Sequence, residues 1–175
     1  MADKLTKDLN RLAAKVKLRP VTPADEDTLL KIYASTREEE MQQATGWSNE
    51  QKEMFLRWQL DMQRRDYEAR FPQADYQIIL FEGAPAGRLW VGRTPEQMRL
   101  LDIAILPEFQ KRKIGSFLLH NLIRESEETG IPLRHMIYKL NTDARRFYER
   151  LGFRLIEDER MYLLMERHPE KQGGQ

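Results

Sequence analysis

Residues 102–119 read DIAILPEFQKRKIGSFLL, and this stretch decides the fold. Its start belongs to an apolar run over residues 99–106, which predicts a strand buried on both faces near the centre of a sheet. Pro107 ends that strand, a short polar loop follows, and apolar residues then recur at helical spacing as far as Gly130. We therefore predict a strand, a tight loop and a helix in succession.

The loop carries three consecutive cations, Lys111, Arg112 and Lys113, directly before the predicted helix. Unpaired N–H groups at the start of a helix and the positive end of the helix dipole attract anions. The junction thus predicts a site for a phosphate or pyrophosphate, with the three cations supplying the countercharge. Taken alone, three cations in a loop are equally typical of a solvated surface.

The first third of the chain predicts one strand and two helices. The strand covers residues 15–21, and Thr22 is placed to cap the first helix. We interpret residues 37–40 as the solvated end of this helix, with a role in holding a cationic substrate as the alternative. Ser48 followed by Gln51 resembles a capping box, which predicts the start of the second helix.

The second helix carries a stripe of large apolar residues at helical spacing, formed by Met54, Phe55, Trp58 and Met62. We interpret this stripe as a packed core face rather than a ligand site, because any amphipathic helix shows such spacing. Trp47 lies between the two predicted helices, where it either staples the second helix or lines a pocket.

The remainder of the chain alternates strands with helices. Strands are expected at residues 76–81, 87–91, 99–106, 133–140, 153–157 and 161–167, and a short helix at 142–151. Strands in a meander, followed by strand, helix, strand and helix, indicate an α/β (α+β) fold with a mixed sheet, which we expect to be mostly antiparallel, with about six or seven strands and about four helices. We expect one domain at residues 15–168, a helical or flexible extension at 1–14 and a frayed tail at 169–175.

A second segment, NTDARRFYERLGF at residues 141–153, directly follows a predicted strand. Together with QKRKIG at residues 110–115, it resembles the two signature motifs of the GNAT superfamily of acyl-CoA-dependent N-acetyltransferases. In that family the first motif is Gln or Arg, two residues, Gly, one residue, and then Gly or Ala. The second motif is matched by Asn141, Ala144, Phe147, Tyr148, Leu151, Gly152 and Phe153. The resemblance covers about residues 17–167 and implies a single-domain GNAT-like fold.

Lys113 stands where the family's loop usually has its first glycine. If the backbone at this position needs a positive φ, a lysine there costs about 1–2 kcal/mol. If the position needs only a backbone N–H, a lysine serves and adds charge.

The resemblance implies that the central strand, the loop and the following helix bind acetyl-CoA. The implied contacts are Ile103, Ala104, Ile105, Gln110, Lys111, Arg112, Lys113, Ile114, Gly115, Ser116, Asn141 and Phe147. Backbone N–H groups of residues 103–105 would hold the cofactor and polarise the thioester carbonyl for direct attack by a neutral amine in a ternary complex. Asn141 is either a cofactor contact or a helix cap.

Tyr148 is the candidate general acid, a role that the family gives to a tyrosine at this position. A phenol with a pKa near ~10 is protonated at neutral pH and can give its proton to a thiolate whose conjugate acid has a pKa near ~8.5. The alternative is that Tyr148 only packs one face of its helix.

Asp102 is the candidate general base, because burial among apolar residues would raise its pKa. The alternative, which we favour slightly, is a carboxylate that caps or orients a neighbouring element. Glu82 and the glutamates at 38–40 are weaker candidates, and we interpret His135 as a structural histidine.

The acceptor is expected to be the amine of a small molecule or a peptide. Tyr33, Trp47 and Trp58 would roof its cleft, because the cofactor occupies the other face. A small-molecule amine, a protein N-terminus and a lysine side chain all stay open, and the glutamates at 38–40 hint at polyamines or aminoglycosides.

Composition excludes several other kinds of site. The chain of 175 residues has no cysteine and three histidines, so we expect no disulfide, no cysteine nucleophile and no metal site. Its 29 Lys and Arg against 28 Asp and Glu give a net charge of +1, which argues against nucleic acid as a partner. We find no signal peptide and no apolar stretch that could span a bilayer, and we expect a cytoplasmic protein with no membrane partner. The sequence leaves a homodimer open.

Two other functions remain as alternatives. Lys113 and the uncertain base motivate a CoA-binding regulatory relative that has lost turnover. A nucleic-acid-binding module would use residues 111–113 with Arg64 and Arg65, but the near-zero net charge and the lack of interleaved aromatic residues weigh against it.

Overall fold

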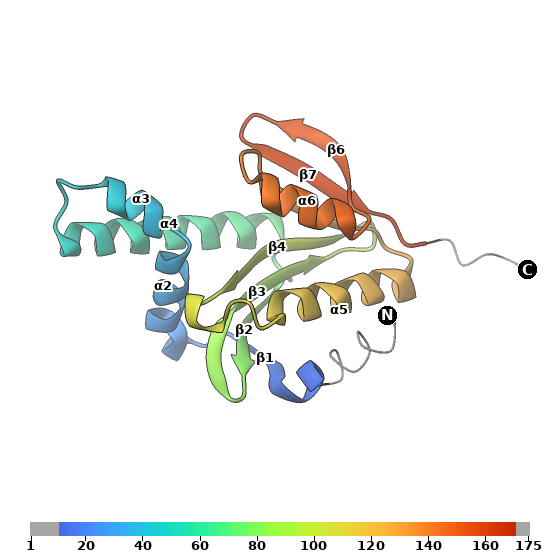
Figure 1. Cartoon of the computed structure of the whole chain (residues 1–175), viewed down its shortest axis with the longest axis horizontal. Helices are drawn as coiled ribbons and strands as arrows, with labels where there is room; N and C mark the ends of the chain where they lie inside the picture. Colours follow the sequence, from blue (N-terminus) through green and yellow to red (C-terminus); the bar gives the residue numbers. More distant parts are fainter. Residues whose placement is uncertain (1–10, 171–175) are drawn as a thin grey trace, which may run out of the picture. The chain divides into compact units, whose positions relative to one another are not determined.

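The computed structural model describes residues 11–170, and residues 11–15 are helical. Seven strands form one sheet in the order β1-β2-β3-β4-β5-β7-β6 (Figure 1). The elements in chain order are β1 (Val16–Pro20), the 3-10 turn η1 (Pro23–Asp25), α2 (Glu26–Ser35), α3 (Glu38–Gln43), α4 (Asn49–Arg70), β2 (Asp75–Phe81), β3 (Ala84–Arg93), β4 (Met98–Ile105), the 3-10 turn η2 (Pro107–Phe109), α5 (Ile114–Thr129), β5 (Leu133–Tyr138), α6 (Thr142–Arg150), β6 (Arg154–Glu159) and β7 (Tyr162–Arg167).

This architecture confirms the expected mixed sheet. β4 and β5 pair in parallel, whereas β1 with β2, β5 with β7 and β6 with β7 pair antiparallel. The apolar run that predicted a central strand is β4, the middle strand of the seven. Parts of the expected extension at 1–14 and of the expected tail at 169–175 lie outside the described residues. None of the helices within residues 11–170 combines the length and the apolar character needed to cross a bilayer.

The described residues divide into two compact units. The first unit contains residues 11–90 and 102–117, and the second contains residues 91–101 and 118–170. β3, β4 and α5 each contribute to both units, and the units are described separately below.

The core of the first unit forms where α2 and α4 pack with strand β2. Leu29 and Ile78 are fully buried, and Leu56 and Leu60 of α4 lie in the same cluster. A buried cluster of this kind supplies most of the stability of short amphipathic helices.

The predicted cap of the second helix is confirmed. The Ser48 hydroxyl accepts a hydrogen bond from the Gln51 N–H at 3.2 Å, and the Gln51 side chain accepts one from the Ser48 N–H at 2.8 Å. These two bonds satisfy backbone donors that the start of a helix otherwise leaves without partners.

A buried carboxylate organises the start of α2. Asp25 accepts hydrogen bonds from both the N–H and the hydroxyl of Thr22 at 2.8 and 2.9 Å. Arg19 of β1 binds the same carboxylate in bidentate fashion, at 2.7 and 2.8 Å. The hydrogen bond from Arg19 is the main reason why the pKa of Asp25 lies well below its ordinary value, while burial opposes that shift.

Two expectations for this region are wrong. The stripe on α4 is not a core face: Met54 is 70% exposed and Trp58 is 59% exposed, because Leu56 and Leu60 form the packed side of that helix. Residues 37–40 are not the end of the first helix, since α2 ends at Ser35 and α3 begins at Glu38.

Glycine at position 87 allows β3 and β4 to approach closely. A Cβ atom at Gly87 would lie 2.1 Å from the backbone oxygen of Ala104 and 3.1 Å from the Cα of Ile105. Both atoms belong to the backbone and cannot rotate away, so no larger residue fits here without displacing β4.

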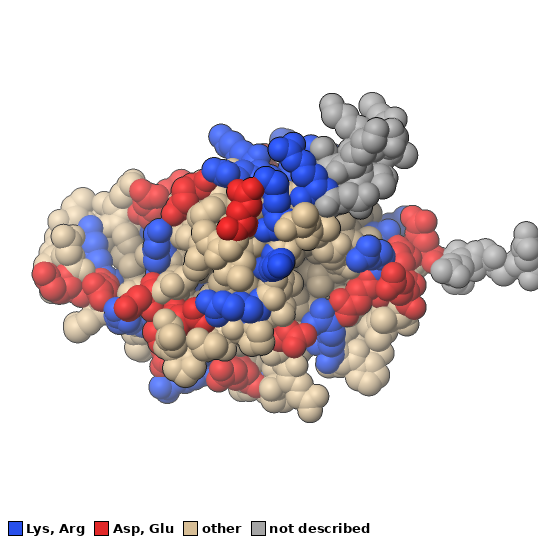
Figure 2. Space-filling view, turned by 90° about the horizontal axis from the view of Figure 1, so that it is seen from below, with Lys and Arg blue, Asp and Glu red and all other residues tan. Residues whose placement is uncertain are grey.

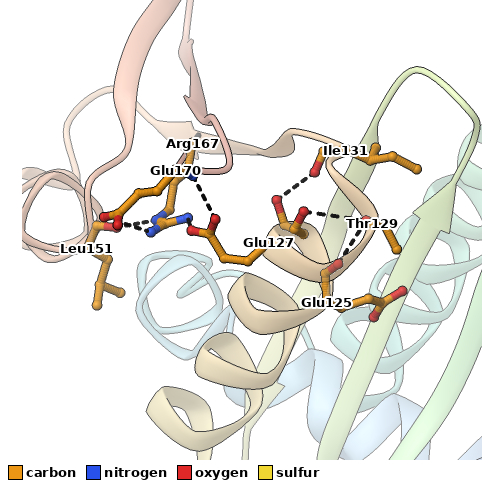
Figure 3. A network of polar contacts seen from close by, with 8 residues as sticks. Glu125, Glu127, Thr129, Ile131, Leu151, Arg167 and Glu170 are labelled. Atoms are coloured by element: carbon orange, nitrogen blue, oxygen red, sulfur yellow. Dashed lines mark hydrogen bonds and ion pairs between the residues drawn. The ribbon is translucent and has the colours of Figure 1, made fainter. Parts of the chain in front are cut away.

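The second unit is held together at one end by Arg167 of β7 (Figure 3). Its Nε donates to the carbonyl oxygen of Leu151 at 3.0 Å, and its guanidinium forms an ion pair with Glu127 of α5. Glu127 also accepts a hydrogen bond from the Glu170 N–H at 2.6 Å. The network therefore joins α5, the end of α6 and the chain after β7.

We predict that Gly87→Ala lowers the free energy of unfolding by about 2–3 kcal/mol, because the new methyl group overlaps the backbone of β4. Urea unfolding followed by circular dichroism would measure the change. Gly46→Ala is the control, since nothing lies within 4 Å of a Cβ there. Equal stabilities of the two variants would contradict the close approach.

We predict that Asp25→Asn lowers the free energy of unfolding at pH 7 by about 2 kcal/mol, because the ion pair with Arg19 and its hydrogen bonds are weakened. The folded-state pKa is depressed, so this contribution is present above the unfolded-state pKa of about 3.9 and is lost as the pH falls below it. The difference between parent and variant should therefore shrink in acid. Asp27→Asn, a change at an exposed carboxylate, should show a small difference that varies little with pH.

Candidate active site

The second half of β4 is where the central strand becomes accessible. Residues 98–101 are buried, whereas Asp102, Ile103 and Ile105 are partly exposed. Among the described residues, the ladder between β4 and β5 pairs Met98–Leu100 with partners on β5, so residues 102–105 lie beyond it. A strand segment that leaves a ladder can offer main-chain groups to an extended ligand.

The loop after β4 is fixed to the first unit at several points. The Leu106 N–H donates to the Ala86 carbonyl at 2.8 Å, and the Gln110 side chain donates to the Ile105 carbonyl at 3.0 Å. Lys31 of α2 forms an ion pair with Glu108 at 2.9 Å. The structure therefore brings Gln110 next to Ile105, two of the residues that the sequence analysis assigns to the cofactor.

The turn that leads into α5 has a left-handed backbone at two lysines. The φ angles of Lys111 and Lys113 are 60° and 62°. Position 113 therefore needs a positive φ, which decides between the two alternatives that the sequence left open. For a residue other than glycine this conformation costs about 1–2 kcal/mol.

A basic hollow of about 390 Å³ lies beside this turn. Its cations come from the loop, from Arg11 and from Lys15. The Arg112 guanidinium lies over the rings of Phe81 and Phe109, at 5.5 and 5.7 Å. Figure 2 shows Lys and Arg side chains gathered in one area of the face that it views. Together with the start of α5, these cations give the first unit a locally positive surface that suits an anion.

The second signature segment forms α6 in the second unit. The Asn141 side chain accepts a hydrogen bond from the Ala144 N–H at 2.9 Å, so Asn141 caps this helix. Tyr148 is 6% exposed, and its ring lies edge-on to those of Phe147 and Phe153 at 5.5 and 5.2 Å. Packing on two sides fixes the orientation of the phenol.

His135 is a structural residue in the second unit, in agreement with the sequence analysis. Its Nδ1 lies 2.8 Å from the carbonyl oxygen of Leu100, which can only accept, so Nδ1 carries the proton. The imidazole ring lies 4.8 Å from the ring of Tyr148.

Asp102 is paired with a residue that sequence reasoning missed. Arg88 of β3 donates from Nε to Asp102 Oδ2 at 2.6 Å, and Arg88 is 1% exposed. This pairing fits the orienting role that the sequence allowed for Asp102. A signal was present, because Arg88 and Asp102 are charged residues within largely apolar segments, and buried charges need partners.

The three predicted acceptor residues differ in their surroundings. Tyr33 is a core residue with its ring 5.3 Å from the Arg88 guanidinium. Trp47 and Trp58 instead pack on Phe55, edge-on at 5.1 Å and stacked at 6.0 Å, and both tryptophans are exposed. A separate hollow of about 580 Å³ between α2, α3 and α4 has none of these three residues in its lining.

Within the part of the chain that the structure describes, no group of three His, Asp or Glu side chains is placed to hold a metal ion. The first unit thus contains a basic turn with two left-handed residues, and the second contains a buried phenol.

A family model described as the acetyltransferase (GNAT) family matches residues 33–153. The chain belongs to the GNAT family. The matched region includes both signature segments, the loop at 110–115 and helix α6.

Curated N-acetyltransferases match over part of their length. The [ribosomal protein bS18]-alanine N-acetyltransferase of Haemophilus influenzae is 30% identical over 79 residues, which is 45% of this chain and 51% of that protein. The uncharacterized N-acetyltransferase CgeE of Bacillus subtilis is 25% identical over 71 residues, which is 41% of this chain and 27% of that protein. The chain thus matches about half the length, or less, of these relatives.

Solved structures share the GNAT fold over most of the chain. The PaiA N-acetyltransferase of Thermoplasma acidophilum, in complex with coenzyme A, has a TM-score of 0.64 and 18% identity, over 87% of this chain and 98% of that one. The ribosomal-protein-S18-alanine N-acetyltransferase of Escherichia coli has a TM-score of 0.61 and 19% identity, over 90% of this chain and 96% of that one.

We predict that Lys113→Gly raises the free energy of unfolding by about 1 kcal/mol, because glycine adopts the left-handed backbone without strain. Chemical denaturation would measure the gain. Arg112→Gly is the control: it lies in the same turn without a positive φ and loses its ring contacts, so it should be destabilising. A loss of stability in Lys113→Gly would show that its side chain stabilises the turn by more than the strain.

Proposed function

We propose that this protein is an N-acetyltransferase that transfers the acetyl group of acetyl-CoA to a primary amine. Membership of the GNAT family supports this proposal. The single observation that carries it is the turn at 110–113, which follows the accessible end of β4, adopts positive φ twice and leads into the start of α5.

The residues of this turn fit the diphosphate of acetyl-CoA. A left-handed turn directs successive backbone N–H groups to one side, and such concavities bind phosphate groups. Lys111, Arg112 and Lys113 are exposed and add charge to this arrangement. We assign the diphosphate to residues 110–115, with the first turn of α5, through Ser116, as part of the same site.

When bound, acetyl-CoA supplies the thioester that the amine attacks. Residues 103–105 would align that group through their main chain and polarise its carbonyl, a contribution that is typically worth a few kcal/mol. Positioning of the two reactants contributes at least as much.

Tyr148 is the proposed general acid. During the transfer the amine nitrogen forms the C–N bond and loses one proton to water, the C–S bond breaks, and the phenol gives its proton to the departing sulfur and regains one from water. The rings of Phe147 and Phe153 fix the orientation of Tyr148 and thereby lower the entropy that proton transfer would otherwise require. We assign Phe147 and Asn141 to the support of this helix and to contacts with acetyl-CoA.

The test is release of free coenzyme A from acetyl-CoA, followed with a thiol reagent across alkyl amines, aminoglycosides and peptides. The chain has no cysteine, so the protein itself adds no thiol signal. Binding of acetyl-CoA by calorimetry without thiol release from any amine would instead indicate a CoA-binding relative that lacks turnover.

We predict that Tyr148→Phe lowers kcat by about a hundredfold or more, because general acid catalysis contributes on that scale. The dissociation constant for acetyl-CoA should stay close to that of the parent. Tyr138→Phe, a change at a half-exposed tyrosine of β5, is the matched control and should leave kcat unchanged. Equal turnover in Tyr148→Phe and in the parent would remove Tyr148 from the mechanism.

A further inference from the structure

The first unit contains a buried charged pair that the proposed mechanism does not use. Arg88 of β3 is 1% exposed, and its Nε donates to Asp102 Oδ2 of β4 at 2.6 Å. Removing a guanidinium from water is strongly unfavourable unless its donors find partners in the protein. An arginine in this place therefore calls for a structural or functional reason.

Arg88 is held from three further elements. It donates to the side-chain oxygen of Gln63 on α4 at 2.8 Å and to the hydroxyl of Tyr76 on β2 at 3.4 Å. The ring of Tyr33 on α2 lies 5.3 Å from its guanidinium. With partners on α2, α4, β2 and β4, the guanidinium has one orientation, and it therefore fixes the carboxylate of Asp102.

Asp102 lies where the central strand becomes accessible. The four preceding residues of β4 are buried, while the Asp102 side chain is 21% exposed. Asp102 also directly precedes residues 103–105, the segment that we assign to the thioester. A fixed and partly exposed carboxylate therefore lies on β4 itself, directly before the residues that we assign to the thioester.

A carboxylate bonded to arginine through one oxygen keeps the capacity to accept further hydrogen bonds. Alkyl amines are mostly protonated at neutral pH, and an ammonium group has three donors but no acceptor. A fixed carboxylate is the natural partner for such a group, because charge-assisted hydrogen bonds are roughly twice as strong as neutral ones.

We propose that Asp102 binds the ammonium group of the acceptor and that Arg88 is the positioning residue that holds Asp102 for this purpose. The acceptor class is then an amine that arrives as a cation, such as an alkyl amine, a lysine side chain or a peptide N-terminus in its protonated form. Amines that are neutral at pH 7 bind without this contact. The inference rests on the proposed N-acetyltransferase function and names the substrate feature that the site selects.

The experiment compares two acceptors at saturating acetyl-CoA: an alkyl amine that is protonated at pH 7 and an arylamine that is neutral there. Asp102→Asn alone would leave Arg88 buried without its countercharge and endanger the fold. The informative variant is therefore the pair Arg88→Gln with Asp102→Asn, which removes both charges together. Thermal unfolding verifies that this variant is folded.

We expect the paired variant to raise the KM for the alkyl amine by about tenfold to a hundredfold, the scale of one lost charge-assisted hydrogen bond. The KM for the arylamine and the KM for acetyl-CoA should change far less, so the preference for the charged acceptor falls. Arg88→Lys keeps the charge but loses the planar fork, and should give an intermediate KM.

The matched control removes a second charged pair, Arg93→Gln with Glu125→Gln, which joins β3 to α5 within the second unit and is more exposed. This control should leave both acceptor KM values unchanged. An equal loss for both acceptors, or a fall in kcat with unchanged KM, would overturn the proposal. If the paired variant does not fold, Arg88→Lys decides the question, and an unchanged KM for the alkyl amine in that variant would overturn the proposal. If the parent releases no coenzyme A with any amine, the proposed function itself fails, which is a distinct result.

Discussion

The first unit is built around one constraint: a guanidinium that is almost fully buried must find all its partners inside the protein. Arg88 meets this demand by drawing on Asp102, Gln63 and Tyr76, with the ring of Tyr33 beside it. These partners lie on two strands, β2 and β4, and two helices, α2 and α4, so one side chain of β3 ties together four other elements of the unit. The close approach of β3 to β4 at Gly87, the neighbouring residue, belongs to the same arrangement.

In the loop after β4, the same two lysines carry both backbone strain and positive charge. Lys111 and Lys113 hold a backbone conformation that glycine would adopt more easily. The turn therefore combines main-chain donors with two more cations than a turn with glycine at positions 111 and 113 would carry. Strained backbone that persists in a structure is often associated with a functional site, and here it lies between the accessible end of β4 and the start of α5.

Sequence patterns predicted the features whose signals are local. The central strand β4 followed from its apolar run, and the start of α4 followed from Ser48 and Gln51, because both depend on neighbours in the chain. The prediction that Met54 and Trp58 belong to a packed core face was wrong, since helical spacing identifies an apolar face but does not show whether another element covers it. Arg88 was missed because its partners lie far away in sequence. The sequence left open whether Lys113 has a positive φ, because the backbone conformation of one residue depends on the whole turn.

The placement of the tryptophans has a consequence for spectroscopy. The chain has three, at positions 47, 58 and 90, and all of them belong to the first unit. Trp90 is buried against Tyr76, with ring centroids 3.9 Å apart, whereas Trp47 and Trp58 are open to solvent. Intrinsic tryptophan emission therefore reports on one half of the molecule, with an iodide-quenchable component from two indoles and a shielded component from the third. The half that contains Tyr148 is silent in such a measurement and needs its own label.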